Sequence, residues 1–243
     1  MSYLKLYIKE LRFVIPSVAL FIVMMLALQA WVHTNSTQWD TLGILIPAVC
    51  LPLLWLLLWV MIIAYLILYT EWKHKSIYMV MSLPLRGWKL ISAKLSAVFS
   101  GAAAITVTGG LSVWLLFKDT ILSITPSSSF AVMDEGLVMG IVLFVAVLVL
   151  LTNTVMLTYL VSRLFRQYPF IIFTCLLFCS FWVLYRLTGM VSPLLSWLPV
   201  VEWQSPEAGV FSYSFGTPLI ILLLSGLLFA ISCWVYEMKL EVE

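Results

Sequence analysis

Long apolar runs alternate with short polar segments along the whole chain. Six of these runs approach or exceed the roughly 20 residues that a helix needs to cross a bilayer. They cover about residues 14–32, 44–70, 91–117, 137–161, 169–189 and 216–236. The pattern predicts an all-α, polytopic membrane protein with six transmembrane helices. We expect residues 1–243 to form a single transmembrane domain.

Composition supports lipid as the solvent for most of this chain. Hydrophobic residues make up 63% of the sequence, and charged residues make up only 10%. A soluble domain typically has about 25% charged residues. A soluble core of this size could not bury so much apolar surface, so soluble folds are excluded.

The basic residues predict the orientation of the spans. The chain has 13 Lys and Arg residues, and only Lys118 and Arg186 lie on the minority side of the predicted spans. The majority are Lys5, Lys9, Arg12, Lys73, Lys75, Arg86, Lys89, Lys94, Arg163, Arg166 and Lys239. Because basic residues concentrate on the cytoplasmic side, both termini are predicted to be cytoplasmic.

Residues 1–13 have polar and apolar positions at helical spacing. The polar face has Ser2, Lys5, Lys9 and Arg12, and apolar residues fill the opposite face. This predicts an amphipathic elbow helix that lies in the inner membrane interface. The alternative is an ordinary basic flank of the first span, which requires no helix.

The predicted cytoplasmic loop at residues 71–90 has the densest charge in the chain. It contains Glu71, several basic residues, and an amphipathic stretch from Ser76 to Leu83 that ends at Pro84. Proline disfavours continuation of a helix at the residue before it. The loop therefore predicts a short basic helix, which suits a docking surface better than a simple connector.

Small and weakly polar residues recur within the spans. Ala97 and Gly101 belong to a row of small residues, with Thr108 in the adjacent row, and Asn153 lies in the fourth span. Small residues let helices approach closely, and polar ones hydrogen-bond between helices. The helix that packs against this row belongs either to the same chain or to a second subunit. The alternative role for the polar residues is to line a polar path.

Residues 190–215 form the longest predicted external segment. It is rich in aromatic residues and is interrupted by prolines, so it is too broken to span. We expect a re-entrant or interfacial segment made of short helices. An outer gate formed by Trp197, Pro199 and Trp203 is one interpretation, and an aromatic membrane anchor is the other.

The sequence argues against several classes of chemistry. It lacks the nucleotide-binding pattern G-x-x-x-x-G-K-[ST], the metalloprotease pattern H-E-x-x-H and the hydrolase pattern G-x-S-x-G. His33 and His74 fall on opposite sides of the predicted membrane, so they cannot share a metal. There is no basic stripe that suits nucleic acid. We expect a protein that is not an enzyme and has no catalytic or metal-binding residues.

The predicted loop at residues 71–90, which we call the basic loop, carries a family resemblance. Glu71, the short basic helix, the run Ser82-Leu83-Pro84-Leu85-Arg86, and Lys94 at the start of the third span resemble the first cytoplasmic loop of ABC-2 type transporter permeases. The elbow, the six spans and the broken external segment are similar too. Chain length is similar to that of bacterial lantibiotic-immunity and bacitracin-resistance permeases.

The resemblance implies a half-transporter in a bacterial plasma membrane. It implies a dimer with an identical or related permease, and a separate cytoplasmic ATPase that holds ATP and Mg²⁺. The substrate would be amphipathic: an antimicrobial peptide or lipophilic drug. The ATPase-coupling residues would be Glu71, Lys73, Lys75, Ile77, Met81, Leu83, Pro84 and Arg86. A non-transporting scaffold or sensor subunit and a membrane enzyme are the alternatives.

Overall fold

Helices make up most of the described part of the chain. The computed structural model describes residues 3–35, 43–44, 46–73, 87–124, 130–165, 168–191, 193, 197, 200–205 and 209–242. Side chains are described in these ranges except at 46, 119–137, 200–214 and 238–242. Six of the described helices are long and apolar enough to cross a membrane, which confirms the predicted all-α fold. The chain is therefore a multi-pass membrane protein.

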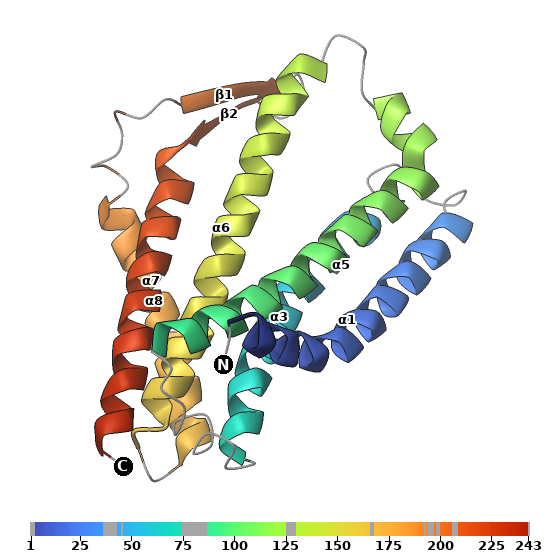
Figure 1. Ribbon diagram of the computed structural model, residues 1–243. Helices are drawn as coiled ribbons and strands as arrows, with labels where there is room; N and C mark the ends of the chain where they lie inside the picture. The colour runs from blue at the N-terminus through green and yellow to red at the C-terminus, as the bar shows by residue number, and fades with distance from the viewer. Residues whose placement is uncertain are drawn as a thin grey trace. The chain divides into compact units, whose positions relative to one another are not determined.

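The chain divides into two compact units, Met1–Pro126 and Ser127–Glu243. The first unit contains α1 (Tyr3–Thr34), the π-helical turn η2 (Ile46–Cys50), α3 (Leu51–Lys73) and α5 (Gly87–Ile124). Within it, α5 packs along α1 and also contacts α3 (Figure 1). The expectation of a single transmembrane domain stays a prediction.

The N-terminal segment predicted as an elbow is continuous with the first span. Both belong to α1, which contains Pro16. Proline has no N–H to donate to the carbonyl four residues earlier, here that of Arg12, and it typically bends a helix. Figure 1 shows the first turns of α1 running at an angle to the rest of the helix.

The described part of the second unit contains three helices and a β-hairpin. These are α6 (Phe130–Ser162), α7 (Pro169–Val191), β1 (Val200–Ser205), β2 (Gly209–Ser214) and α8 (Gly216–Val242). Helix α6 packs mainly against α8, and α7 contacts both of them less extensively. Only 6% of the most apolar stretch of α7 is buried, so this helix has a wide exposed face.

The expectation of short helices within residues 190–215 is wrong for its second half. Strands β1 and β2 pair antiparallel there, in a register that runs from Val200 opposite Ser214 to Ser205 opposite Gly209. Half of the residues in each strand are β-branched or aromatic, and these residue types favour strands over helices.

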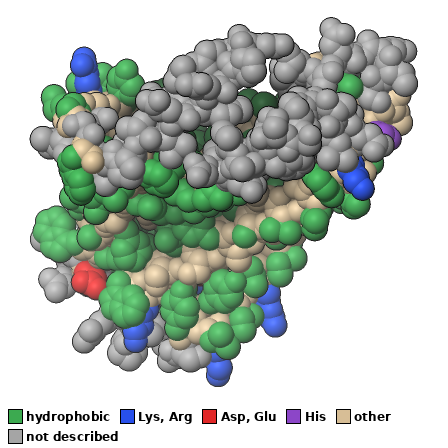
Figure 2. Space-filling view, turned by 90° about the horizontal axis from the view of Figure 1, so that it is seen from above, with side chains coloured by type: hydrophobic (Ala, Val, Ile, Leu, Met, Phe, Trp, Pro, Cys, Tyr) green, Lys and Arg blue, Asp and Glu red, His purple; other side chains and the backbone are tan. Residues whose placement is uncertain are grey.

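Hydrophobic side chains cover much of the described helix surface (Figure 2). Leu20 is 64% exposed, Leu115 is 77% exposed and Phe178 is 72% exposed. In water such exposure costs about 25 cal/mol per Å² of apolar surface. In a bilayer these side chains face hydrocarbon, and the helical backbone satisfies its own hydrogen bonds.

Candidate functional site

Charged side chains from three helices meet inside the first unit. Lys94 in α5 is fully buried, and its Nζ lies 2.7 Å from Oε1 of Glu71 in α3. The same Nζ donates a hydrogen bond to Oε1 of Glu10 in α1 at 3.2 Å. The exposed side-chain fractions of Glu10 and Glu71 are 6% and 8%. We call Glu10, Glu71 and Lys94, together with Lys9, the ion cluster.

Lys9 balances the charge of the cluster from its outer side. Its Nζ lies 3.6 Å from Oε1 of Glu71 and 3.9 Å from Oε1 of Glu10. The Lys9 side chain is 49% exposed, so its ammonium group remains hydrated. Two lysines then face two glutamates, and the formal charges cancel. This balance matters because a buried charge without a partner is costly.

Helical periodicity explains why these residues point inward. Leu6, Glu10 and Val14 follow one another at four-residue intervals and are all buried. Residues at this spacing share one face of a helix. In α5, Leu90, Lys94 and Val98 repeat the same spacing and are also buried. The cluster therefore lies where the buried faces of α1 and α5 meet.

Glu71 was predicted as an ATPase-coupling residue, and Glu10 was not predicted at all. A charged side chain on a basic amphipathic segment is usually solvated, so the residue type of Glu10 does not predict that it is buried. Its position did indicate burial, because Glu10 lies between Leu6 and Val14 on one helix face. A carboxylate between buried apolar residues needs a partner of opposite charge. The apolar side chains of Tyr3, Leu4 and Ile8 instead lie exposed.

Most of the predicted coupling residues lie outside the described residues. This holds for Lys75, Ile77, Met81, Leu83, Pro84 and Arg86. Lys73 is described: it ends α3, and its Nζ lies 6.0 Å from the centre of the Tyr69 ring. Glu71 and Lys94 thus bracket the segment at 74–86, and the structure brings these two residues together.

The row of small residues in α5 packs within the same chain. A Cβ added at Gly101 would lie 2.8 Å from Cη2 of Trp59 and 2.9 Å from Cγ1 of Val14. Ala97, one turn earlier, is fully buried. Thr108 donates its hydroxyl to the carbonyl of Ala104 at 2.8 Å, within its own helix. A neighbouring helix therefore occupies this row at Gly101.

Asn153 links two helices of the second unit. Its Nδ2 donates to Oγ of Ser225 at 2.7 Å and to the carbonyl of Ser225 at 3.3 Å. Asn153 is in α6 and Ser225 is in α8, and both residues are buried. The arrangement favours interhelical packing as the role of Asn153.

The three predicted gate residues are only partly described. Trp197 is 76% exposed. Pro199 lies outside the described residues, and Trp203 is described only by its backbone, which pairs with that of Phe211. The outer gate therefore stays a prediction.

A second buried polar group lies deeper in the first unit. Gln29 in α1 is 1% exposed. Its amide nitrogen donates to the carbonyl of Ala48 at 3.3 Å, and its amide oxygen accepts a hydrogen bond from Oγ of Ser112. Pro52 follows Ala48 by four residues and has no N–H to offer that carbonyl. Gln29 also borders a cavity of about 180 Å³ between α1, α3 and α5.

Comparisons with protein-family models, curated proteins and solved structures find no match. The described residues contain no group of three or more His, Cys, Asp or Glu side chains that could hold a metal ion. The ion cluster, which joins three helices beside the two ends of the basic loop, is therefore the candidate functional site.

Proposed function

We propose that the chain is the permease subunit of an ABC-2 type transporter. It exports an amphipathic substrate, such as an antimicrobial peptide or a lipophilic drug, and a separate cytoplasmic ATPase binds ATP and Mg²⁺ and supplies the energy. The observation that carries this proposal is the 2.7 Å ion pair between Glu71 and Lys94, which closes the base of the basic loop.

The ion cluster gives the loop a mechanical connection to three helices. Glu71 lies two residues before the end of α3, and Lys94 lies two turns into α5. Glu10 adds α1 to the same contact. Separating a buried ion pair leaves uncompensated charges, which costs about 3–5 kcal/mol. A push on the loop is therefore transmitted to α1, α3 and α5 as one rigid body.

The distribution of charge places this loop in the cytoplasm in our proposal. Four lysines lie before the first predicted span or in the basic loop, the same segments that supply Glu10 and Glu71: Lys5, Lys9, Lys73 and Lys89. Basic flanks of this kind stay on the cytoplasmic side. The location that follows is a bacterial plasma membrane, with both termini inside and with a second permease as partner.

The weakly polar interior supports an amphipathic substrate. Among the described side chains of the first unit, Gln29 is the buried polar residue outside the ion cluster, and it is already bonded to Ala48 and Ser112. Ion and sugar carriers usually place ionisable residues deep in their spans. Peptides and lipophilic compounds need fewer polar contacts, so they suit this interior better.

The test is reconstitution of the full-length chain with the ABC ATPase that the proposal requires. Leu83→Asp and Arg86→Glu are introduced in the loop, and Lys118→Glu is the matched charge control. Losing an interface hot spot costs about 2 kcal/mol, so each loop variant should bind the ATPase about 30-fold more weakly. Permease-stimulated ATP turnover should fall with it. Unchanged binding and turnover in both loop variants would refute the proposal and leave the scaffold or sensor role.

A further inference from the structure

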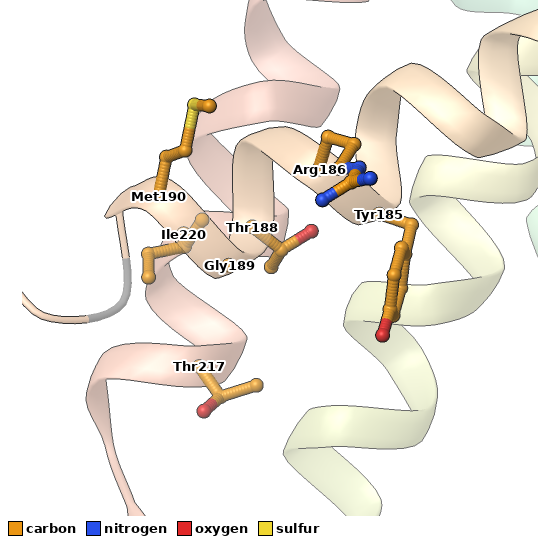
Figure 3. A pocket seen from close by; sticks show the side chains of 7 residues that line it. All are labelled: Tyr185, Arg186, Thr188, Gly189, Met190, Thr217 and Ile220. Atoms are coloured by element: carbon orange, nitrogen blue, oxygen red, sulfur yellow. The ribbon is translucent and has the colours of Figure 1, made fainter.

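The cavity of about 180 Å³ in the first unit reaches the interior of that unit. Two of the residues that line it, Leu56 and Ile105, are only 1% and 2% exposed. A larger cavity of about 530 Å³ lies at the ends of α7 and α8 in the second unit. Figure 3 shows Tyr185 and Met190 on opposite sides of the larger cavity, and both are more than two-thirds exposed. The smaller cavity is therefore the better enclosed of the two.

The polar groups that line the smaller cavity are already hydrogen-bonded. The amide group of Gln29 is bonded to Ala48 and Ser112. The hydroxyl of Thr106 donates to the carbonyl of Ala102 at 2.9 Å. A buried water needs about two to four polar partners, and an apolar cavity of about 150 Å³ stays dry and takes up apolar molecules. The lining therefore favours an apolar ligand over water.

The cavity opens to the outside between α3 and α5. Leu53 in α3 is 36% exposed, and Thr106 in α5 is exposed too. On the opposite side, Met25 and Gln29 of α1 are buried and close the cavity. An opening between two membrane-spanning helices lies at the depth of the bilayer hydrocarbon. A ligand therefore enters sideways from the membrane.

The cavity is elongated along the helices. Its lining extends along α5 from Ile105 to Val113, which is about 12 Å at 1.5 Å per residue. Ile105 lies near the middle of the predicted span at residues 91–117. Val113 lies near one end of that span, and Gln29, which is bonded to the neighbouring Ser112, marks the same end. The cavity therefore extends from near one membrane surface to the middle of the bilayer.

These dimensions suit a hydrocarbon chain better than a ring. The hydrocarbon of one leaflet is about 15 Å thick, so the lining covers most of its depth. A volume of about 180 Å³ over that length leaves a mean cross-section of about 15 Å², which is close to that of one extended hydrocarbon chain. A lipid in this leaflet also has its acyl chains parallel to the cavity.

We propose that this cavity binds one acyl chain of a membrane lipid. The chain enters between α3 and α5, with its headgroup end toward Gln29 and its terminal carbons beside Leu56 and Ile105. In the predicted orientation the lipid belongs to the outer leaflet. The site needs no ATPase and does not depend on the proposed transport function.

The first test is photo-labelling of the full-length protein in lipid nanodiscs. The probe is a phosphatidylcholine with a diazirine near the end of one acyl chain, and mass spectrometry locates the adducts. The wild type should form adducts at Leu56 and Ile105, which the surrounding lipid does not reach because both are buried. Leu115 is 77% exposed and should be labelled in any case. Adducts at Leu115 with none at Leu56 or Ile105 would overturn the proposal.

A matched pair of variants tests whether the chain occupies the cavity. Thr106 lines the cavity, whereas the adjacent Val107 is 60% exposed and is not part of the lining. Thr and Val are nearly equal in shape, so Thr106→Phe and Val107→Phe make the same change in size. A phenyl ring inside the cavity competes with the chain for space, so Thr106→Phe should reduce labelling of Leu56 about tenfold. Val107→Phe should retain it, and equal labelling of Leu56 in the two variants would contradict the site.

A second probe separates an acyl chain from a lipophilic ring. A phenyl diazirine without a chain is added to the nanodiscs at the same mole fraction as the lipid probe. Labelling of Leu56 and Ile105, measured relative to Leu115, should be stronger with the acyl-chain probe. Equal or stronger labelling of these two residues by the ring would refute the acyl-chain assignment.

Discussion

Lys94 is fully buried, and its ammonium nitrogen lies 2.7 Å from a carboxylate oxygen of Glu71. The two residues are far from each other along the chain because the basic loop separates them. Their contact turns the ends of α3 and α5 into one structural element. Glu10 extends that element to α1 at 3.2 Å.

Replacing Lys94 should destabilise the first unit strongly. Lys94→Met keeps the length of the side chain but leaves Glu10 and Glu71 buried with only the half-exposed Lys9 as a cation. We expect a loss of about 3–5 kcal/mol in unfolding free energy. Thermal unfolding in detergent measures this. Lys118→Met, on the same helix but exposed, should change stability by less than about 0.5 kcal/mol.

Removing the partner carboxylate should recover part of that loss. In Lys94→Met/Glu71→Met, two apolar side chains replace the ion pair, and Glu10 keeps Lys9 as its neighbour. Contacting residues couple by about 0.5–3 kcal/mol in a double-mutant cycle. The double variant should therefore be more stable than Lys94→Met alone. Additive losses would show that Lys94 and Glu71 do not interact.

Gly101 should tolerate no side chain. Gly101→Ala places a Cβ 2.8 Å from the ring of Trp59 and 2.9 Å from Val14, so α5 must move away from its neighbours. Overpacking of this kind costs about 1–3 kcal/mol. Gly110→Ala is the matched control, because a Cβ there meets nothing within 4 Å. It should be neutral or gain up to about 1 kcal/mol from helix propensity.

Gln29 should be required for the turn that opens α3. Gln29→Leu is similar in size but cannot donate to the carbonyl of Ala48, and Pro52 cannot replace it. A buried acceptor left without its donor costs about 1–3 kcal/mol. Thr108→Val removes only a bond within one helix turn and should cost less. Equal unfolding temperatures for Gln29→Leu and wild type would contradict this role.

The sequence predicted the six membrane-length helices well because apolar length alone specifies them. Close packing of another helix against Gly101 in α5 was predicted, but the identity of that helix was not. A small residue shows that space is available and does not identify the side chain that fills it. Glu10 was missed because burial of a charge depends on a tertiary partner, here Lys94. The hairpin was not predicted because the prolines of residues 190–215 were interpreted as breaks between short helices. The alternation of apolar and polar residues around Trp203 favours strands instead.

In the proposed transporter, the basic loop docks on a cytoplasmic ATPase. The most direct measurement is site-specific photo-crosslinking in cells, with benzoyl-phenylalanine replacing Leu83 in one strain and Trp197 in another. We predict a covalent adduct between position 83 and a cytoplasmic ABC ATPase, and no such adduct from position 197. Absence of the adduct at position 83, or equal adducts at both positions, would contradict it.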